Sequence, residues 1–177
     1  TSVPRVNSRL KALKDAGFIR ALSTPFFSQS LYSVCPTSAE LLGNRIAGLL
    51  RGRSSSPRFL QHALATTNVR VALLKKGATA WRFEQQLTTE FRYAGRTFEV
   101  RPDGLAIFQD SNTAVEVDLG HVAPSKFAEK LKGFEAFVRS GELERCWNMQ
   151  SLSLLVVTTG PRRARKLTSL AKHHTTF

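Results

Sequence analysis

The sequence contains few of the residues that would point to an oxidising compartment or to a membrane. Its two cysteines, Cys35 and Cys146, lie far apart and form no CxxC motif. With no secretory signal, they are expected to be reduced, buried thiols of a cytoplasmic protein. The longest apolar run, residues 152–157, is well below the ~18 residues that a membrane-spanning helix needs. The sequence therefore predicts neither a disulfide scaffold nor a membrane partner.

Acidic residues are scarce in the first half of the chain. Residues 1–83 contain 13 Lys and Arg but only two acids, a net charge of +11, whereas residues 84–177 contain 13 Lys and Arg and 11 acids, a net charge of +2. This asymmetry indicates two modules, of which the basic one binds a polyanion by displacing condensed counterions. A basic solubilising surface is the alternative. The hydrophobic fraction of 42% is that of a folded protein.

The beginning of the chain has the pattern of a helix followed by a hairpin. Val6, Leu10 and Leu13 fall on one helical face, and Gly17 is placed to end the helix. Residues 18–22 and 31–34 then have the composition of two strands. This order is typical of a winged helix-turn-helix, whose recognition helix enters the major groove of DNA. The candidate DNA contacts on this helix are Arg5, Asn7, Ser8, Arg9, Lys11 and Lys14.

A basic, small and proline-terminated segment, residues 51–57, is the best candidate for a linker. It follows a further helical stretch at residues 37–50, and its Arg51 and Arg53 are additional candidate DNA contacts. We therefore predict a winged-helix DNA-binding domain over residues 1–56 and a second domain over residues 57–177.

The second domain has the pattern of an α/β fold, which makes the whole chain α+β. Helices are expected at residues 58–76 and 79–89, strands at 91–100, 104–109 and 114–119, and then a helix, a strand and a helix at 125–140, 152–158 and 162–173. The strand–helix–strand unit of residues 114–158 implies a parallel crossover. Four cations open the last helix, where the helix dipole disfavours them, so an external phosphate is their expected partner: Arg162, Arg163, Arg165 and Lys166.

Carboxylates gather around the predicted strands of this domain. Asp103 starts one strand, and Glu116 and Asp118 project from the same face of the next because side chains alternate along a strand. Glu84, on the preceding helix, is placed to join or orient them. Clustered carboxylates suit Mg²⁺ or Mn²⁺, which activates water and neutralises phosphoryl charge in phosphodiester hydrolysis. The alternative is that these carboxylates are solvated at the edge of the sheet and only balance the basic charge of the chain.

The order Pro102-Asp103, a spacer, then an acidic pair on the next strand resembles the PD-(D/E)XK nuclease fold. The usual Glu-X-Lys element is replaced here by residues 116–118, Glu-Val-Asp. Some members of that superfamily carry the lysine on the following helix, where this chain has Lys126 and Lys130. The resemblance implies that Lys130 stabilises the developing phosphoryl charge.

The whole chain resembles the replication-relaxation family of plasmid and mobile-element proteins, some of which are mobilization relaxases. The matching pieces are residues 9–19, 61–73, 101–104, 115–118 and 130–134, in the order of the family. The resemblance implies DNA binding by an N-terminal winged helix, whose first helices would precede residue 1, and a nuclease-like C-terminal domain with an αβββαβ core. It also implies double-stranded DNA, replication or relaxosome proteins and a second copy of the chain as candidate partners.

Several alternatives stay open at this point. The protein is expected to be a metal-dependent endonuclease or nickase, or else an inactive DNA-binding accessory factor or transcriptional regulator that keeps the nuclease fold as a scaffold. His62 is expected to be a structural histidine, and His121 to lie near the acidic strand. A covalent tyrosine mechanism is disfavoured, because Tyr32 and Tyr93 are the only tyrosines and neither lies in a histidine cluster.

Overall fold

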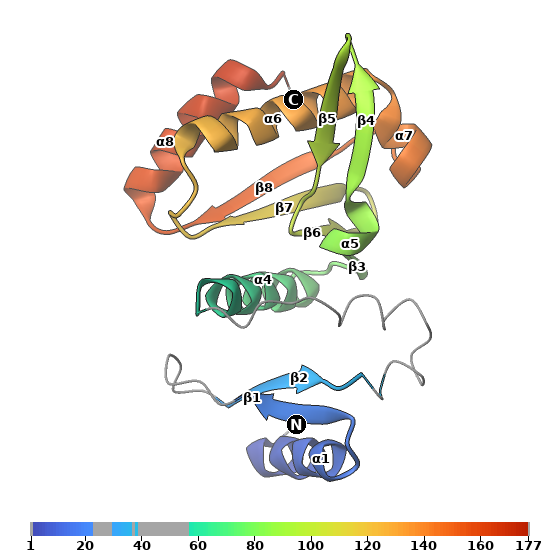
Figure 1. Ribbon diagram of the computed structural model, residues 1–177, viewed down its shortest axis with the longest axis vertical. Helices are drawn as coiled ribbons and strands as arrows, with labels where there is room; N and C mark the ends of the chain where they lie inside the picture. Colours follow the sequence, from blue (N-terminus) through green and yellow to red (C-terminus); the bar gives the residue numbers. More distant parts are fainter. Residues whose placement is uncertain (1, 23–29, 37, 39–56, 177) are drawn as a thin grey trace. The chain divides into compact units, whose positions relative to one another are not determined.

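A computed structural model describes residues 2–22, 30–36, 38 and 57–176 of the chain (Figure 1). The protein has a mixed α+β fold that divides into two units, residues 1–59 and 60–177, with the division inside helix α4. Within the described residues, no helix is long and apolar enough to cross a membrane. The expected helix at residues 37–50 and the linker at 51–57, with Arg51 and Arg53, fall outside the described residues apart from residue 38 and Pro57, which begins α4.

Unit 1 contains the helix and hairpin that the sequence predicts. Helix α1 (Val3–Asp15) is followed by strands β1 (Ile19–Leu22) and β2 (Leu31–Val34), which pair in antiparallel fashion from Ile19 opposite Val34 to Leu22 opposite Leu31. Gly17, with φ +75°, adopts the left-handed conformation that ends the helix. The backbone carbonyl of Phe18 accepts hydrogen bonds from the Cys35 amide at 2.9 Å and from the Ser38 hydroxyl at 2.5 Å. These contacts join the two ends of the hairpin.

Unit 2 is built on a four-stranded sheet with the order β3-β6-β7-β8. Strands β3 (Ala80–Phe83), β6 (Gly104–Ile107) and β7 (Asn112–Asp118) are antiparallel neighbours, and β8 (Ser153–Thr158) is parallel to β7. Helices α6 (Pro124–Arg139) and α7 (Glu142–Trp147) connect β7 to β8. The predicted parallel crossover is therefore confirmed.

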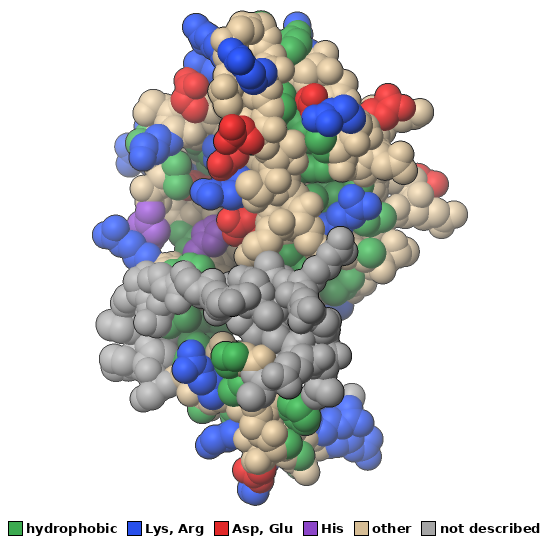
Figure 2. All heavy atoms as spheres, turned by 45° about the vertical axis from the view of Figure 1, so that its right-hand side comes forward, with side chains coloured by type: hydrophobic (Ala, Val, Ile, Leu, Met, Phe, Trp, Pro, Cys, Tyr) green, Lys and Arg blue, Asp and Glu red, His purple; other side chains and the backbone are tan. Residues whose placement is uncertain are grey.

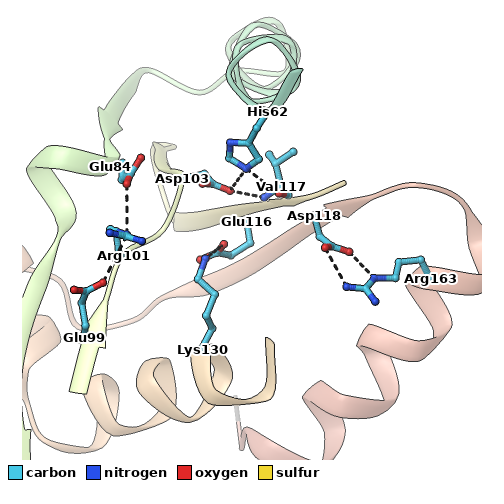
Figure 3. A network of polar contacts seen from close by, with 10 residues as sticks. All are labelled: His62, Glu84, Glu99, Arg101, Asp103, Glu116, Val117, Asp118, Lys130 and Arg163. Carbon is cyan, nitrogen blue, oxygen red and sulfur yellow. Dashed lines mark hydrogen bonds and ion pairs between the residues drawn. The ribbon is translucent and has the colours of Figure 1, made fainter. Parts of the chain in front are cut away.

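Helices lie on both sides of this sheet (Figures 1 and 3). Helix α6 and the last helix, α8 (Pro161–His174), lie on one side, and α4 (Pro57–Lys75) on the other. Under α6, the rings of Phe137 and Trp147 meet at 4.8 Å between centroids, within a core that includes Phe134 and Leu105. A smaller cluster of Phe127, Leu131 and Leu167 joins α6 to α8. These two clusters fix the helices against β7 and β8.

A separate hairpin, β4 (Thr89–Tyr93) and β5 (Arg96–Val100), packs against α6 through Phe91, whose ring lies 5.4 Å from that of Phe137. The sequence predicted one strand over this segment. The chain instead reverses at Ala94 and Gly95, both with positive φ.

Two further expectations are wrong. Residues 79–89 form strand β3 and the four-residue helix α5 (Glu84–Leu87) rather than one helix, because Ala80–Phe83 pairs with β6. Cys146 is exposed and Cys35 only half-buried, although both are free thiols.

Candidate functional site

The turn that carries Asp103 is fixed by close packing at its two neighbours. Pro102 is fully buried, and the Asp103 amide donates to the Val115 carbonyl at 3.0 Å. Gly104 begins β6 beneath the Trp81 ring, and a Cβ atom at this position would lie 1.9 Å from a ring carbon. Only glycine allows this approach. The packing therefore sets the direction in which the Asp103 side chain leaves the sheet.

Asp103 connects β7 to helix α4. Its Oδ2 accepts a hydrogen bond from the Val117 amide at 2.7 Å and lies 3.3 Å from His62 Nε2 (Figure 3). His62 Nε2 also lies 3.0 Å from the Val117 carbonyl oxygen, which can only accept, so this nitrogen carries the proton. The hydrogen bond with Asp103 raises the pKa of His62 against the opposing effect of burial. His62 is therefore in direct contact with Asp103, one of the carboxylates that the sequence predicts for the site.

Glu116 points from β7 toward helix α6 and is 4% exposed. Lys130, one of the two lysines expected to replace the missing motif lysine, donates from α6 to Glu116 Oε2. The other oxygen, Oε1, is buried without a hydrogen-bond partner among the described residues. Burial raises the pKa of Glu116 to about 7, and the charge of Asp103 adds to the rise while Lys130 opposes it. Glu116 is therefore a half-satisfied buried carboxyl group close to a second carboxylate.

Asp118 projects from the same side of β7 but is occupied by other partners. Its oxygens accept hydrogen bonds from Arg163 at 2.6 and 3.1 Å, from the Thr158 hydroxyl at 3.0 Å and from the Gly120 amide at 3.3 Å. Burial acts to raise the pKa of Asp118, but these donors, Arg163 first, together hold it below its ordinary value. Arg163 also donates to the Val122 carbonyl at 2.6 Å. The structure places Asp118 in an internal ion pair.

The remaining candidates lie at the margin. Glu84 is 43% exposed at the start of α5 and lies 3.5 Å from Arg101, which also lies 3.6 Å from Glu99. Lys126 and His121 are exposed. Among the described residues, no group of three or more His, Cys, Asp or Glu side chains is arranged to hold a metal ion. Asp103, Glu116 and Asp118 thus do not form one three-carboxylate cluster.

Two carboxylates are still a sufficient protein contribution for one cation. Mg²⁺ keeps most of its water and commonly takes one or two carboxylates together with a substrate phosphate. Glu116 offers an oxygen for this purpose, since its Oε1 is buried without a partner among the described residues, and the charge of Asp103 acts on it. Asp118 does not fit it, because Arg163 and Thr158 already occupy both of its oxygens.

The candidate DNA contacts of α1 are all exposed. Lys11 differs from the others because its Nζ lies 2.6 Å from Asp15. On α8, Arg162, Arg165 and Lys166 are exposed, whereas Arg163 is turned inward to Asp118 and is no longer a candidate phosphate contact. Figure 2 shows Lys and Arg side chains on the visible face of both units, and most of the visible acidic side chains on unit 2.

Sequence reasoning gave His62 a structural role and did not connect it with Asp103. The only available signal was its place in one of the segments that resemble the replication-relaxation family, residues 61–73. The protein-family model described as replication-relaxation matches residues 2–151. No curated protein and no solved structure matches the chain significantly.

Proposed function

The chain belongs to the replication-relaxation family, and we propose that it binds DNA and acts in the replication or mobilization of a plasmid or mobile element as a metal-dependent endonuclease or nickase. One observation carries the proposal. Glu116 is buried, has Lys130 on one oxygen and no partner among the described residues on the other, and feels the charge of Asp103. Perturbed carboxyl groups of this kind concentrate at functional sites.

The side chains have distinct proposed roles. Asp103 and Glu116 hold the cation, which when bound supplies an activated water and neutralises phosphoryl charge. Lys130 keeps its ammonium beside Glu116 and stabilises negative charge that develops on the phosphate. His62 is a positioning residue, because its Nε2–H and the Val117 amide hold Asp103 Oδ2 from two sides. Glu84, paired with Arg101 at the start of α5, is proposed to orient the cluster rather than to bind the cation.

DNA binding is proposed for the exposed cations of unit 1 and for Arg162, Arg165 and Lys166 at the start of α8. Unit 1 combines a basic helix with a hairpin, which is the arrangement expected of a DNA-binding helix with a wing. Residues 1–83 carry a net charge of +11. Neutralisation of phosphates by such cations makes the affinity fall steeply with salt. A Kd for duplex DNA that barely changes between low and moderate salt would contradict this part of the proposal.

A cleavage assay tests the catalytic part. Supercoiled plasmid is incubated with Mg²⁺ or Mn²⁺ and with wild type, Asp103→Asn, Glu116→Gln or Lys130→Met. Asp110→Asn is the matched control, because Asp110 is an exposed carboxylate of the same sheet region. We expect nicking by wild type and by the control and loss of nicking in the three site variants. Nicking that all three site variants retain would overturn the assignment.

A second candidate function is a DNA-binding accessory protein that has lost cleavage. The observation that favours it is the pairing of Asp118 with Arg163, which leaves two carboxylates where the sequence offered three. Isothermal titration with Mg²⁺ and Mn²⁺ separates the two functions. A nuclease binds the cation in a manner that Glu116→Gln abolishes, whereas an accessory protein binds DNA without binding either metal.

A further inference from the structure

A groove of about 570 Å³ lies between the β4–β5 hairpin, α6 and the C-terminal end of α8, away from the carboxylates of β7. Figure 1 shows α8 beside α6. The side chains that matter for its chemistry are two aromatic rings and four cations: Tyr93, Phe98, Arg96, Lys132, Arg139 and Lys172. None of these cations is among the DNA contacts proposed above.

Two of the four cations already have acidic partners. Arg139 Nε lies 2.5 Å from Glu135 Oε1, and Lys132 Nζ lies 2.7 Å from Glu129 Oε1. Within the part of the chain that the structure describes, neither Arg96 nor Lys172 forms an ion pair. Arg96 also helps to lower the pKa of Glu129. Glu135 is the one carboxylate among the lining residues, so the cations of the groove outnumber its acids and leave it with a net positive charge. The ligand that such a groove attracts is therefore an anion.

The C-terminal end of α8 is held in place. The Thr176 hydroxyl donates to Glu135 Oε1 at 2.6 Å and the Thr176 amide to Glu135 Oε2 at 2.9 Å, while Arg139 donates to both Glu135 and Thr176. Glu135 is thereby satisfied, and its pKa is lowered despite the burial that opposes this, because Thr176 and Arg139 stabilise the charged form. This network fixes the α8 wall of the groove against α6.

The hairpin supplies the aromatic wall. Tyr93 and Arg96 are directly opposite each other at its tip, so their side chains share one face of the hairpin. Phe98 shares this face because it is two residues from Arg96, and Tyr93 is 37% exposed. An exposed ring beside free cations is the combination by which proteins hold single strands: bases stack on the ring while the cations track the phosphates. A duplex hides the faces of its bases and cannot use the ring.

We propose that this groove binds single-stranded DNA without sequence preference. The inference relies on the proposed function only in taking DNA as the partner, and it requires no cleavage and no metal. In a protein that nicks or opens DNA, such a groove holds a released strand away from the complementary one.

The test measures binding of a labelled oligo(dT) to the full-length chain in EDTA, by fluorescence anisotropy. Arg96→Glu is compared with Arg92→Glu, which makes the same charge change at an exposed residue on the opposite face of the same hairpin. Tyr93→Ala tests the aromatic wall. Stacking of a base on a ring typically contributes about 1–3 kcal/mol, so its loss should lower the affinity fivefold or more. Circular dichroism checks that each variant is folded.

We expect Arg96→Glu and Lys172→Glu to weaken oligo(dT) binding by about tenfold at low salt and to reduce the dependence of affinity on salt. Tyr93→Ala is expected to weaken binding with little change in salt dependence. The groove proposal would be wrong if Arg92→Glu and Arg96→Glu lost oligo(dT) affinity equally. It would also be wrong if Arg96→Glu lost as much affinity for duplex DNA as for oligo(dT). Clear preference for oligo(rU) over oligo(dT) would overturn the assignment to DNA.

These outcomes are independent of the catalytic proposal. If neither wild type nor Glu116→Gln nicks plasmid, but Arg96→Glu selectively loses oligo(dT) binding, the nuclease proposal is wrong and the groove proposal is supported. If wild type nicks plasmid and the groove variants bind oligo(dT) as wild type does, the groove proposal is wrong and the nuclease proposal is supported.

Discussion

Lys130 donates a hydrogen bond to one oxygen of Glu116, and the other oxygen is buried with no hydrogen-bond partner among the described residues. Asp118, two residues along the same strand, differs because both of its oxygens accept hydrogen bonds. A buried charge with incomplete hydrogen bonding destabilises a fold. Stability alone therefore accounts for Asp118 but not for Glu116, which is the reason to place the functional site at Glu116.

The first prediction concerns the pH dependence of stability. Burial raises the pKa of Glu116 from 4.5 in the unfolded chain to about 7. Between these values the folded state binds more protons than the unfolded state, so the free energy of unfolding falls as pH rises from 4.5 through 7. Glu116→Gln removes this fall, which amounts to up to about 3 kcal/mol. Urea unfolding of wild type and Glu116→Gln at pH 5, 6, 7 and 8 measures the difference.

His62 titrates in the same region and must be separated from Glu116. Its pKa is raised by Asp103, so its stabilising contribution is present below its ordinary pKa and disappears as pH rises through the raised value. Both groups therefore make stability fall with rising pH. A Glu116→Gln variant whose stability depends on pH as steeply as that of wild type would show that Glu116 is ionised throughout, with Lys130 dominating over burial.

The sequence was sufficient to predict elements whose partners lie close along the chain. The β1–β2 hairpin and the β7–α6 unit arise from local patterning, and the helix after β7 brings Lys130 back across the strand to Glu116. Lys130 could be named beforehand, together with Lys126, only through the resemblance to the nuclease superfamily, in which some members carry the lysine on this helix. Asp103 could be named from the order of the strands, since it precedes β6, and β6 and β7 are consecutive antiparallel neighbours.

Contacts between distant segments were not predictable in this way. The Arg163–Asp118 pair depends on where α8 lies after β8, and the His62–Asp103 pair depends on α4 crossing the other side of the sheet. Residues 79–89 were mistaken for one helix because a four-residue strand is too short to show a period, and only pairing with β6 determines its conformation. Local pattern therefore identified the carboxylates but not their partners.

A second prediction follows from the Arg163–Asp118 pair. Arg163→Met leaves Asp118, which is 3% exposed, without its main partner. We expect the free energy of unfolding to fall by about 3 kcal/mol at pH 7, as for the loss of one member of a buried pair. Asp118→Asn/Arg163→Met removes both charges and should recover part of the loss. Because the pKa of Asp118 is lowered, the wild-type contribution is present at neutral pH and is lost only as pH falls below about 4.

Urea unfolding at pH 7 and pH 3 measures these differences. If Arg163→Met is as stable as wild type at pH 7, the Arg163 ion pair does not stabilise Asp118, which is then again available to a cation. The double variant is also predicted to nick plasmid if wild type does, since Asp118 lies outside the proposed cation site.

A third prediction concerns His62. His62→Phe keeps an aromatic ring on α4 but removes the Nε2–H that holds Asp103 and the Val117 carbonyl. Residues that hold a metal ligand in place without binding the metal typically contribute 10–100-fold to metal affinity or activity. We therefore expect the affinity for Mn²⁺ to fall about 10–100-fold. Gln61→Ala, at the exposed neighbouring position, is the control. Calorimetric titration with Mn²⁺ is the measurement, and unchanged Mn²⁺ affinity in a folded His62→Phe would remove His62 from the site.

A fourth prediction distinguishes two cations of α1 that the sequence treated alike. Arg9 and Lys11 are both exposed, but Lys11 Nζ lies 2.6 Å from Asp15, while Arg9 forms no ion pair among the described residues. The carboxylate beside Lys11 repels phosphate and offsets the attraction of the ammonium.

We therefore expect Arg9→Ala to weaken duplex binding severalfold and to reduce the salt slope by about one, and Lys11→Ala to change both much less. In Asp15→Asn, where Lys11 is released, duplex affinity should rise and Lys11→Ala should then cost as much as Arg9→Ala. Anisotropy titrations over a range of salt concentrations measure all four variants, and an equal effect of Arg9→Ala and Lys11→Ala in the presence of Asp15 would show that the ion pair does not govern how α1 meets DNA.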